Sequence, residues 1–136
     1  MYEIFGHTAD VGLRMRAADL NQLFADAGRA LFAVILVDLD QVEPRQQVRC
    51  RIDEPQREYL LLDWLTELLY HFESQRLLLK EFSVDVSDQG LEAVAEGETF
   101  DAQRHRLDHE VKAITYHNLR VQQTADGWEA EVILDL

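Results

Sequence analysis

The sequence predicts a single α+β domain in which two long helices pack on a largely antiparallel or mixed β-sheet. Residues 19–35 and 54–72 repeat apolar side chains at helical spacing, and about seven shorter segments alternate apolar and polar side chains. With 136 residues, the chain has the size of one domain and is long enough to bury most of its apolar side chains. We therefore expect residues 1–136 to form one domain with the element order ββαβαββββ.

The N-terminal half predicts three strands and the first helix. Residues 2–5 suggest a short strand, a polar turn follows, and the alternation over 11–16 indicates a second strand. Asp19 is a suitable N-cap for the helix after it, with Gln22 three residues further on. An acidic connector then leads to a third alternating segment at 47–53. The apolar positions of the helix are Leu20, Leu23, Phe24, Ala27, Leu31, Val34 and Ile35.

The second helix is expected to begin at Glu54-Pro55, because proline is tolerated in the first turn. Its broad apolar stripe is suited to covering a sheet. A strand over 77–87, a turn at 88–90 and a return strand over 91–96 follow as a hairpin. The stripe consists of Leu61, Leu62, Trp64, Leu65, Leu68, Leu69 and Phe72.

The segment 108–121 places a lysine, acids and histidines in a pattern typical of a strand, and Asp126-Gly127 predicts a turn into a last strand over 128–136. On this pattern Lys112 shares one face with Ile114 and Tyr116. A lysine in such surroundings either extends its ammonium group to solvent from an edge strand or meets an acid. The pattern alone leaves both readings open.

The charge balance restricts the class of partner. Against 26 acidic residues the chain has 13 lysines and arginines, which gives a net charge of −13. Such a field repels phosphate backbones and anionic membranes, so we expect no direct nucleic-acid binding and no membrane association. A cation or a basic protein surface is the better-matched partner.

The cysteine usage and the N-terminus predict a soluble cytoplasmic protein. Cys50 is the only cysteine, which excludes an intramolecular disulfide and suits a reducing compartment. Its alternating surroundings favour a buried structural thiol. The chain starts as a strand without a signal-peptide pattern, and no apolar run approaches the roughly 18 residues that a membrane helix needs.

Oxygen donors stand near both ends of the chain. Asp10 lies between Gly6 and Gly12, and Asp135 is followed at once by the carboxylate of Leu136. If the fold brings these groups together, they suit Ca²⁺, Mg²⁺ or Mn²⁺, which prefer oxygen ligands. Ordinary solvated acids explain the same residues if it does not.

The sequence shows no other recognisable site. The five histidines are scattered, and Cys50 has no partner at zinc-ligand spacing. No phosphate-binding glycine loop, nucleophile elbow or HExxH motif is present. Of the histidines, His7 is placed to orient a carboxylate, His71 to lie at the boundary of the second helix, His105 and His109 to be solvated in connecting sequence, and His117 to bond in a turn.

Three segments together resemble the archease family. They are His7-Thr-Ala-Asp-Val-Gly-Leu13, Glu110-Val-Lys-Ala-Ile-Thr-Tyr-His117 and Val132-Ile-Leu-Asp-Leu136, and they occur in the family's order in a chain of matching length and helix order. The middle segment is long and specific. Asp108-His109 departs from the pattern, because a glycine-containing turn is expected there.

The resemblance implies an accessory protein without catalytic residues of its own. By this resemblance, the protein would act as archeases do, as an activator of the RtcB-type RNA ligase of tRNA splicing and RNA repair. It would promote the guanylylation and the multiple turnover of that ligase. By the same resemblance, Asp10, Asp135 and the carboxylate of Leu136 would be metal ligands for a divalent cation such as calcium. Lys112 would be a required cation, acting with Asp10 and Asp135 in ligase activation.

Two other functions remain as alternatives. One is a chaperone or specificity modulator of a tRNA-modifying enzyme such as a methyltransferase, which would be indifferent to metal. The other is a stand-alone metal-dependent hydrolase, for which His7 or Glu110 would serve as the general base.

Overall fold

The computed structural model describes residues 1–6 and 9–136, and over these residues the chain forms two long helices, one short 3₁₀ helix and seven strands. The order is the one predicted. The elements are β1 (Tyr2–Phe5), β2 (Asp10–Ala17), α1 (Leu20–Ile35), the 3₁₀ helix η1 (Leu39–Gln41), β3 (Gln46–Asp53), α2 (Arg57–Gln75), β4 (Leu77–Ser87), β5 (Gly90–Thr99), β6 (Ala113–Thr124) and β7 (Gly127–Asp135).

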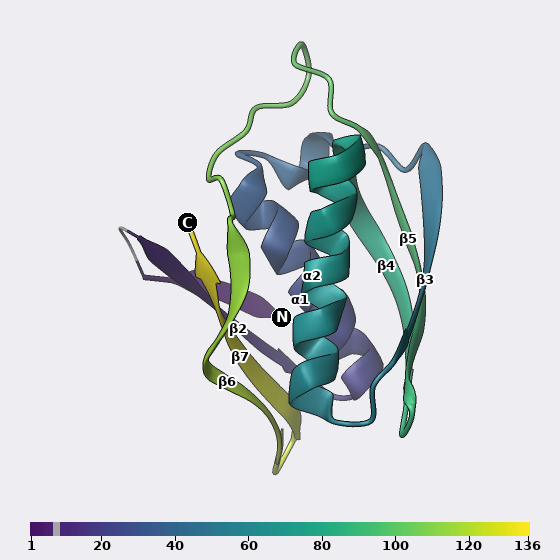
Figure 1. Cartoon of the computed structure of the whole chain (residues 1–136), viewed down its shortest axis with the longest axis vertical. Helices are drawn as coiled ribbons and strands as arrows, with labels where there is room; N and C mark the ends of the chain where they lie inside the picture. The colour runs from purple at the N-terminus through teal and green to yellow at the C-terminus, as the bar shows by residue number, and fades with distance from the viewer. Residues whose placement is uncertain (7–8) are drawn as a thin grey trace.

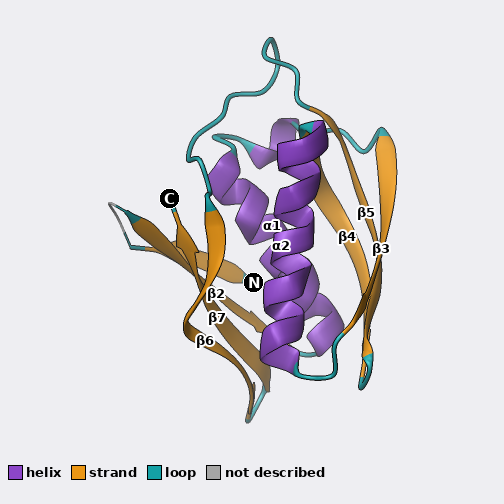
Figure 2. Cartoon of the chain, in the orientation of Figure 1, coloured by secondary structure: helices purple, strands orange, loops and turns teal. Residues whose placement is uncertain are grey.

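The strands form two antiparallel sheets with the helices between them (Figures 1 and 2). One sheet has four strands in the order β1-β2-β7-β6, and the other has three in the order β3-β5-β4. The predicted α+β class is thus confirmed, but the expected single sheet is replaced by two. Two sheets form because α1 buries residues around most of its circumference and therefore needs other elements packed on more than one side.

Helix α1 begins where its sequence predicts. The Asp19 side chain accepts a hydrogen bond from the backbone N–H of Gln22 at 2.8 Å and caps the helix. The Gln22 side chain donates to Asp26 instead of returning to the cap, so no capping box forms. Gly28 faces the ring of Phe82, which a β-carbon would meet at 3.0 Å, and this glycine lets β4 approach the helix closely.

Helix α2 begins at Arg57, two residues after the proline that was expected in its first turn. Pro55 therefore precedes the helix, and Gln56 occupies the cap position without a side-chain hydrogen bond. The predicted apolar stripe forms the core contact: Trp64 is fully buried, and its indole N–H donates to the carbonyl of Phe24 in α1 at 2.9 Å.

The C-terminal strands differ from their predicted bounds. β6 begins at Ala113 and continues past His117 to Thr124, with an irregular register between Thr115 and Arg120 where Asn118 has φ of 53°. This bulge absorbs the polar residues that suggested an end of the strand. The backbone N–H of His117 donates to the Thr115 hydroxyl at 3.3 Å, a local bond of the predicted kind inside the strand.

The prediction that His105 is solvated is wrong. Its side chain is fully buried, and its Nε2 lies 3.1 Å from a carboxylate oxygen of Glu98 at the end of β5. Glu98 also accepts hydrogen bonds from the Glu43 backbone and from Arg104, so this buried carboxylate is well satisfied. The cluster anchors the long connection between β5 and β6.

Across the part of the chain that the structure describes, neither helix is long and apolar enough to cross a membrane.

Candidate functional site

Strand pairing places Asp10 and Asp135 directly opposite each other. Asp10 is the first residue of β2, Asp135 is the last residue of β7, and the two are register partners in the antiparallel β2–β7 ladder. Opposing residues of a ladder project to the same face of the sheet. Both aspartates are exposed, and both lie on the face turned away from the helices because Val11 and Leu134 beside them are buried.

The hydrogen bonds show which type of cross-strand pair this is. The N–H of Leu136 donates to the carbonyl of Ala9 at 2.9 Å, so Ala9 and Leu136 occupy a hydrogen-bonded position. Asp10 and Asp135, one step along the ladder, are therefore the non-hydrogen-bonded pair, in which opposing side chains come closest. We call these two residues the aspartate pair.

Further along the same ladder, opposing charged residues have opposite signs. Arg14 is the register partner of Glu131, and Arg16 is the register partner of Glu129. Their side chains form ion pairs at 3.1 Å and 2.8 Å. Opposing like charges destabilise a sheet, whereas opposite charges stabilise it. The aspartate pair is the position at which the β2–β7 ladder opposes two like charges.

The arginine–glutamate pairs also shift the acid–base behaviour of their members. Hydrogen bonds from Arg16 and then Arg120 hold the pKa of Glu129 below its ordinary value. The hydrogen bond to Glu3, followed by the charge of Glu131, raises the pKa of Arg14. The basic side chains on this face are thus engaged with glutamates, and no ion pair joins either aspartate to a basic group within residues 1–6 and 9–136.

A shallow hollow lies beside Asp10. It has a volume of about 240 Å³, and its lining includes Phe5, Gly6, Gly12 and Ile133. The ring of Phe5 rests on Gly12 so closely that a β-carbon there would come within 2.2 Å of the ring. Gly12, the register partner of Phe5, therefore leaves room for the Phe5 ring, which forms part of the wall of this hollow.

Lys112 reaches the same end of the sheet from β6. Its backbone N–H donates to the carbonyl of Asp135 at 2.8 Å, and the next residue, Ala113, is the register partner of Asp135. Lys112 is exposed and lies just before the strand instead of within it. Among the described residues its ammonium makes no ion pair, so it is the backbone of Lys112 that the structure fixes next to Asp135.

The donor set fits a hard divalent cation. The aspartate pair supplies carboxylate oxygens from one face of the sheet, and the backbone of Leu136 is held next to Ala9 at the same edge. Oxygen donors of this kind suit Ca²⁺, Mg²⁺ or Mn²⁺, and water completes the coordination. His7, expected to orient a carboxylate here, lies outside the described residues, and Glu110 is exposed in the connection before β6.

The sequence did not reveal two features of the molecule. The first is the matching of opposite charges across the β2–β7 ladder, which depends on strand register. The sequence did contain a signal for it, because two arginines alternate along one segment and two glutamates along another: Arg14, Arg16, Glu129 and Glu131. The second is a pair of possible metal ligands near Cys50, which has no partner at zinc-ligand spacing along the chain. In the fold its thiol lies near Glu67 and His71 of α2.

Comparisons with known proteins identify the family of this chain. The Archease protein family matches residues 2–136. The protein archease of Methanosarcina acetivorans is 36% identical over 99% of this chain and 95% of its own length. That of Methanopyrus kandleri is 37% identical, with 99% of each chain covered.

Solved structures give the same result. The solution structure of protein 1598 of Methanobacterium thermoautotrophicum superposes with a TM-score of 0.82 at 36% identity, covering 99% of this chain and 98% of that one. An archease from Thermotoga maritima, described as a possible chaperone, shares the fold with a TM-score of 0.68 at 15% identity, covering 100% and 98%. The family match and the relatives extend over nearly the whole chain, and this protein therefore belongs to the archease family.

Proposed function

We propose that this protein activates an RtcB-type RNA ligase in tRNA splicing and RNA repair, promoting guanylylation and multiple turnover of the ligase. The aspartate pair and the carboxylate of Leu136 would hold a divalent cation for this purpose, with Lys112 beside it. The observation that carries the proposal is the direct opposition of Asp10 and Asp135 in the closest type of cross-strand pair.

The charge pattern supports a cation at this position. Two like charges opposite each other cost stability in a sheet whose neighbouring rungs are matched. A bound cation removes that repulsion and explains why the pair is placed there. The exposure of both aspartates leaves the site open to a second molecule.

The overall charge supports a protein partner with a basic surface. With a net charge of −13, the chain would be steered toward the basic cleft in which a ligase binds RNA and nucleotide. The protein itself would contribute no catalytic group to the joining reaction.

Each site residue then has a physical task in the complex. A divalent cation at this site would supply positive charge to phosphate oxygens as pyrophosphate leaves. The aspartates would bind and orient that charge at the end of the sheet. Lys112, which is exposed and unengaged among the described residues, would contact a phosphate oxygen electrostatically.

The test is a ligase assay with and without this protein. Transfer of labelled GMP to the ligase and the number of RNA ligation turnovers are measured for wild type, Asp10→Ala, Asp135→Asn and Lys112→Ala. We expect each variant to lose stimulation while its circular dichroism spectrum is unchanged. Asp126→Asn, an exposed acid in the β6–β7 turn at the opposite end of the sheet, is the matched control and should stimulate normally.

Three outcomes contradict the proposal. Normal stimulation by Asp10→Ala would remove the aspartate pair from the mechanism. Stimulation that persists after full chelation would favour a metal-independent chaperone or modulator of a tRNA-modifying enzyme. Turnover of nucleotide or cyclic-phosphate RNA by the purified protein without ligase would favour a hydrolase.

A further inference from the structure

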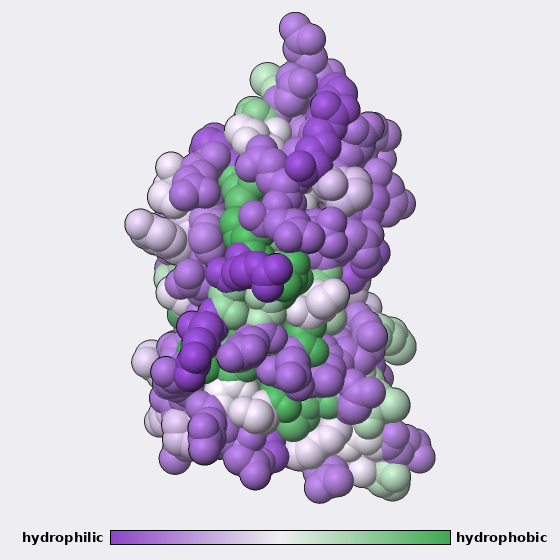
Figure 3. All heavy atoms as spheres, turned by 90° about the vertical axis from the view of Figure 1, so that its right-hand side faces the viewer, coloured by the Kyte–Doolittle hydropathy of each residue, from purple (hydrophilic) through white to green (hydrophobic). Residues whose placement is uncertain are grey.

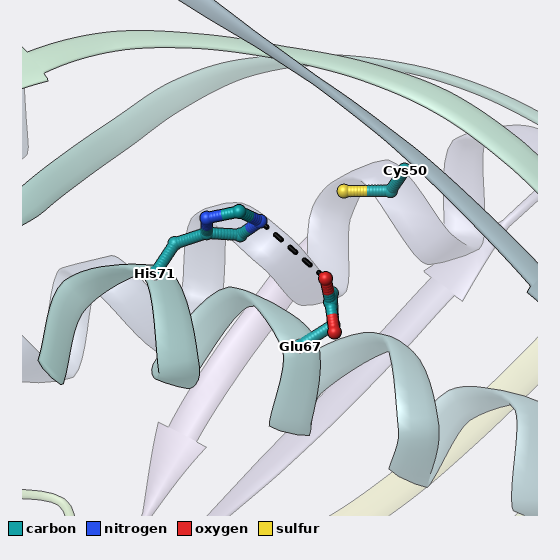
Figure 4. A group of neighbouring side chains, drawn as sticks. All are labelled: Cys50, Glu67 and His71. Carbon is teal, nitrogen blue, oxygen red and sulfur yellow. Dashed lines mark ion pairs between the residues drawn. The ribbon is translucent and has the colours of Figure 1, made fainter. Parts of the chain in front are cut away.

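A second group of ligand-type side chains lies between α2 and the three-stranded sheet. The thiol of Cys50, a carboxylate oxygen of Glu67 and a ring nitrogen of His71 all lie within 4.8 Å of one another (Figure 4). The aspartate pair is on the other sheet, so the two groups are separate. The side of the molecule that carries the three-stranded sheet is mainly hydrophilic, with a narrow hydrophobic band (Figure 3).

The fold assembles this group from two elements. Glu67 and His71 are four residues apart on α2, so they lie one above the other on the same face of the helix. Cys50 is in β3, an edge strand, and is buried, whereas Arg49 and Arg51 beside it are exposed on the opposite face. The thiol therefore points toward the helix and meets the glutamate–histidine pair, as Figure 4 shows.

Within the described residues, the imidazole of His71 has no hydrogen-bond partner. Both ring nitrogens are buried, and neither has a hydrogen-bond partner in the described part of the chain. Nε2 lies 3.5 Å from Glu67 Oε1, a distance that allows an ion pair but does not make a hydrogen bond here. Buried polar atoms are nearly always satisfied, and a cation bound between the thiol, the carboxylate and this nitrogen would satisfy it.

The separations fit tetrahedral coordination. Bonds of roughly 2.0–2.3 Å from a central Zn²⁺ to nitrogen, oxygen and sulfur place neighbouring ligand atoms roughly 3.3–3.8 Å apart. The 3.5 Å between Nε2 and Oε1 already lies in this range, and the thiol needs only a small movement. A thiolate, an imidazole and one carboxylate favour a borderline cation over Ca²⁺ or Mg²⁺.

We propose that Cys50, Glu67 and His71 form a binding site for a borderline divalent cation, best matched by Zn²⁺, that links strand β3 to helix α2. The Glu67 side chain is 45% exposed and gives the cation a route from solvent. Three protein ligands leave the fourth position to water. The site is distinct from the aspartate pair and does not depend on the function proposed above.

Binding is balanced by release of one proton. Burial, and then the negative charge of Glu67, raise the pKa of the Cys50 thiol to about 11, so without a cation the thiol is protonated. Coordination forms a metal–sulfur bond and releases the thiol proton to solvent. The thiolate and the glutamate carboxylate then neutralise the two positive charges of the cation.

The second ring nitrogen of His71 sets an expectation for affinity. Metal-binding histidines usually donate their other N–H to an acceptor, and loss of such a partner costs about 10- to 100-fold in affinity. Nδ1 has no such acceptor within the described residues. We therefore expect binding weaker than at a closed structural zinc site.

The test uses Co²⁺ as a spectroscopic substitute for Zn²⁺ in the full-length protein. Because Cys50 is the only cysteine, a thiolate-to-cobalt charge-transfer band can arise only from this site. We expect such a band, with visible bands of a tetrahedral ion, saturating at one equivalent and disappearing when Zn²⁺ is added. Zn²⁺ should also raise the melting temperature of the protein.

Variants distinguish a metal site from the alternative that Cys50 is only a packed side chain next to the Glu67–His71 ion pair of α2. We expect Cys50→Ala to abolish the charge-transfer band, and His71→Gln and Glu67→Gln to weaken Co²⁺ binding by at least about tenfold. The matched controls are His109→Gln and Glu73→Gln, which change exposed residues and should bind normally.

Two results would overturn the proposal. One is a wild-type protein that shows no thiolate-to-cobalt band. The other is a Co²⁺ affinity, measured from this band, that is unchanged in both His71→Gln and Glu67→Gln. Glu67→Gln alters a half-exposed side chain, so this comparison remains decisive even if Cys50→Ala fails to fold.

Discussion

Replacing Asp135 by asparagine should stabilise the protein when no divalent cation is present. The substitution removes one of two like charges that face each other at a non-hydrogen-bonded position of the β2–β7 ladder. Opposing Cβ atoms in such a pair lie roughly 5 Å apart, and two unit charges at that separation in surroundings close to water repel by roughly 0.8 kcal/mol before screening by salt. We therefore expect a gain of about 0.5 kcal/mol, which for a domain of this size raises the melting temperature by roughly 1–4 °C.

The assay is thermal unfolding of wild type and Asp135→Asn, followed by circular dichroism in chelator and again in saturating Ca²⁺. In chelator the variant should melt at the higher temperature, and the difference should shrink as salt is added. In Ca²⁺ the order should reverse, because the cation stabilises only the wild type. Glu131→Gln is the matched control: Glu131 faces Arg14 in the same ladder and pairs with it at 3.1 Å, so its loss should lower the melting temperature.

The expected repulsion would be refuted if Asp135→Asn melted at a lower temperature than the wild type in chelator, as Glu131→Gln should. The aspartate pair would then be held by favourable contacts and not by a cation. An identical Ca²⁺ response in both proteins would lead to the same conclusion.

Two further predictions concern the core and the loop cluster. Trp64→Phe removes the indole donor and leaves the buried carbonyl of Phe24 without it, so we expect roughly 2–4 kcal/mol loss in the free energy of unfolding by urea denaturation. For Glu98, burial raises the pKa, but hydrogen bonds from the Glu43 backbone, Arg104 and His105 outweigh it, so the folded pKa lies below the ordinary 4.5. Its contribution to stability is therefore complete above the unfolded value and is lost as pH falls through the folded one. The stability difference between wild type and Glu98→Gln should be constant at neutral pH and shrink below pH 4.5, and a difference that grows in acid would contradict this.

The element order could be predicted because it depends on local patterns. The helical spacing of apolar residues gave α1 and α2, and Asp19 marked the beginning of α1 because its side chain caps the helix. Pro55 was less informative about α2, because a proline suits both the first turn and the residues just before a helix. Asn118 shows a further limit, since a bulge inside β6 resembles the end of a strand in the sequence.

The candidate site was named from motif residues, but their meeting depends on register. Strand pairing alone places Asp10 opposite Asp135, and a shift of one residue would have sent one of the two side chains to the other face. The environment of His105 depends on long-range contacts in the same way, because a histidine in polar sequence is usually solvated and this one is buried against Glu98.

By itself, the sequence determined the fold class, the order of elements, the acidic surface and the family resemblance, because composition, periodicity and motifs are properties of neighbouring residues. Only the tertiary structure decided that the strands divide into two sheets, that the aspartate pair faces a ladder of matched charges, and that Cys50 meets Glu67 and His71. These arrangements arise from strand register and from the packing of a helix on a sheet, which depend on how distant segments bury their apolar faces together.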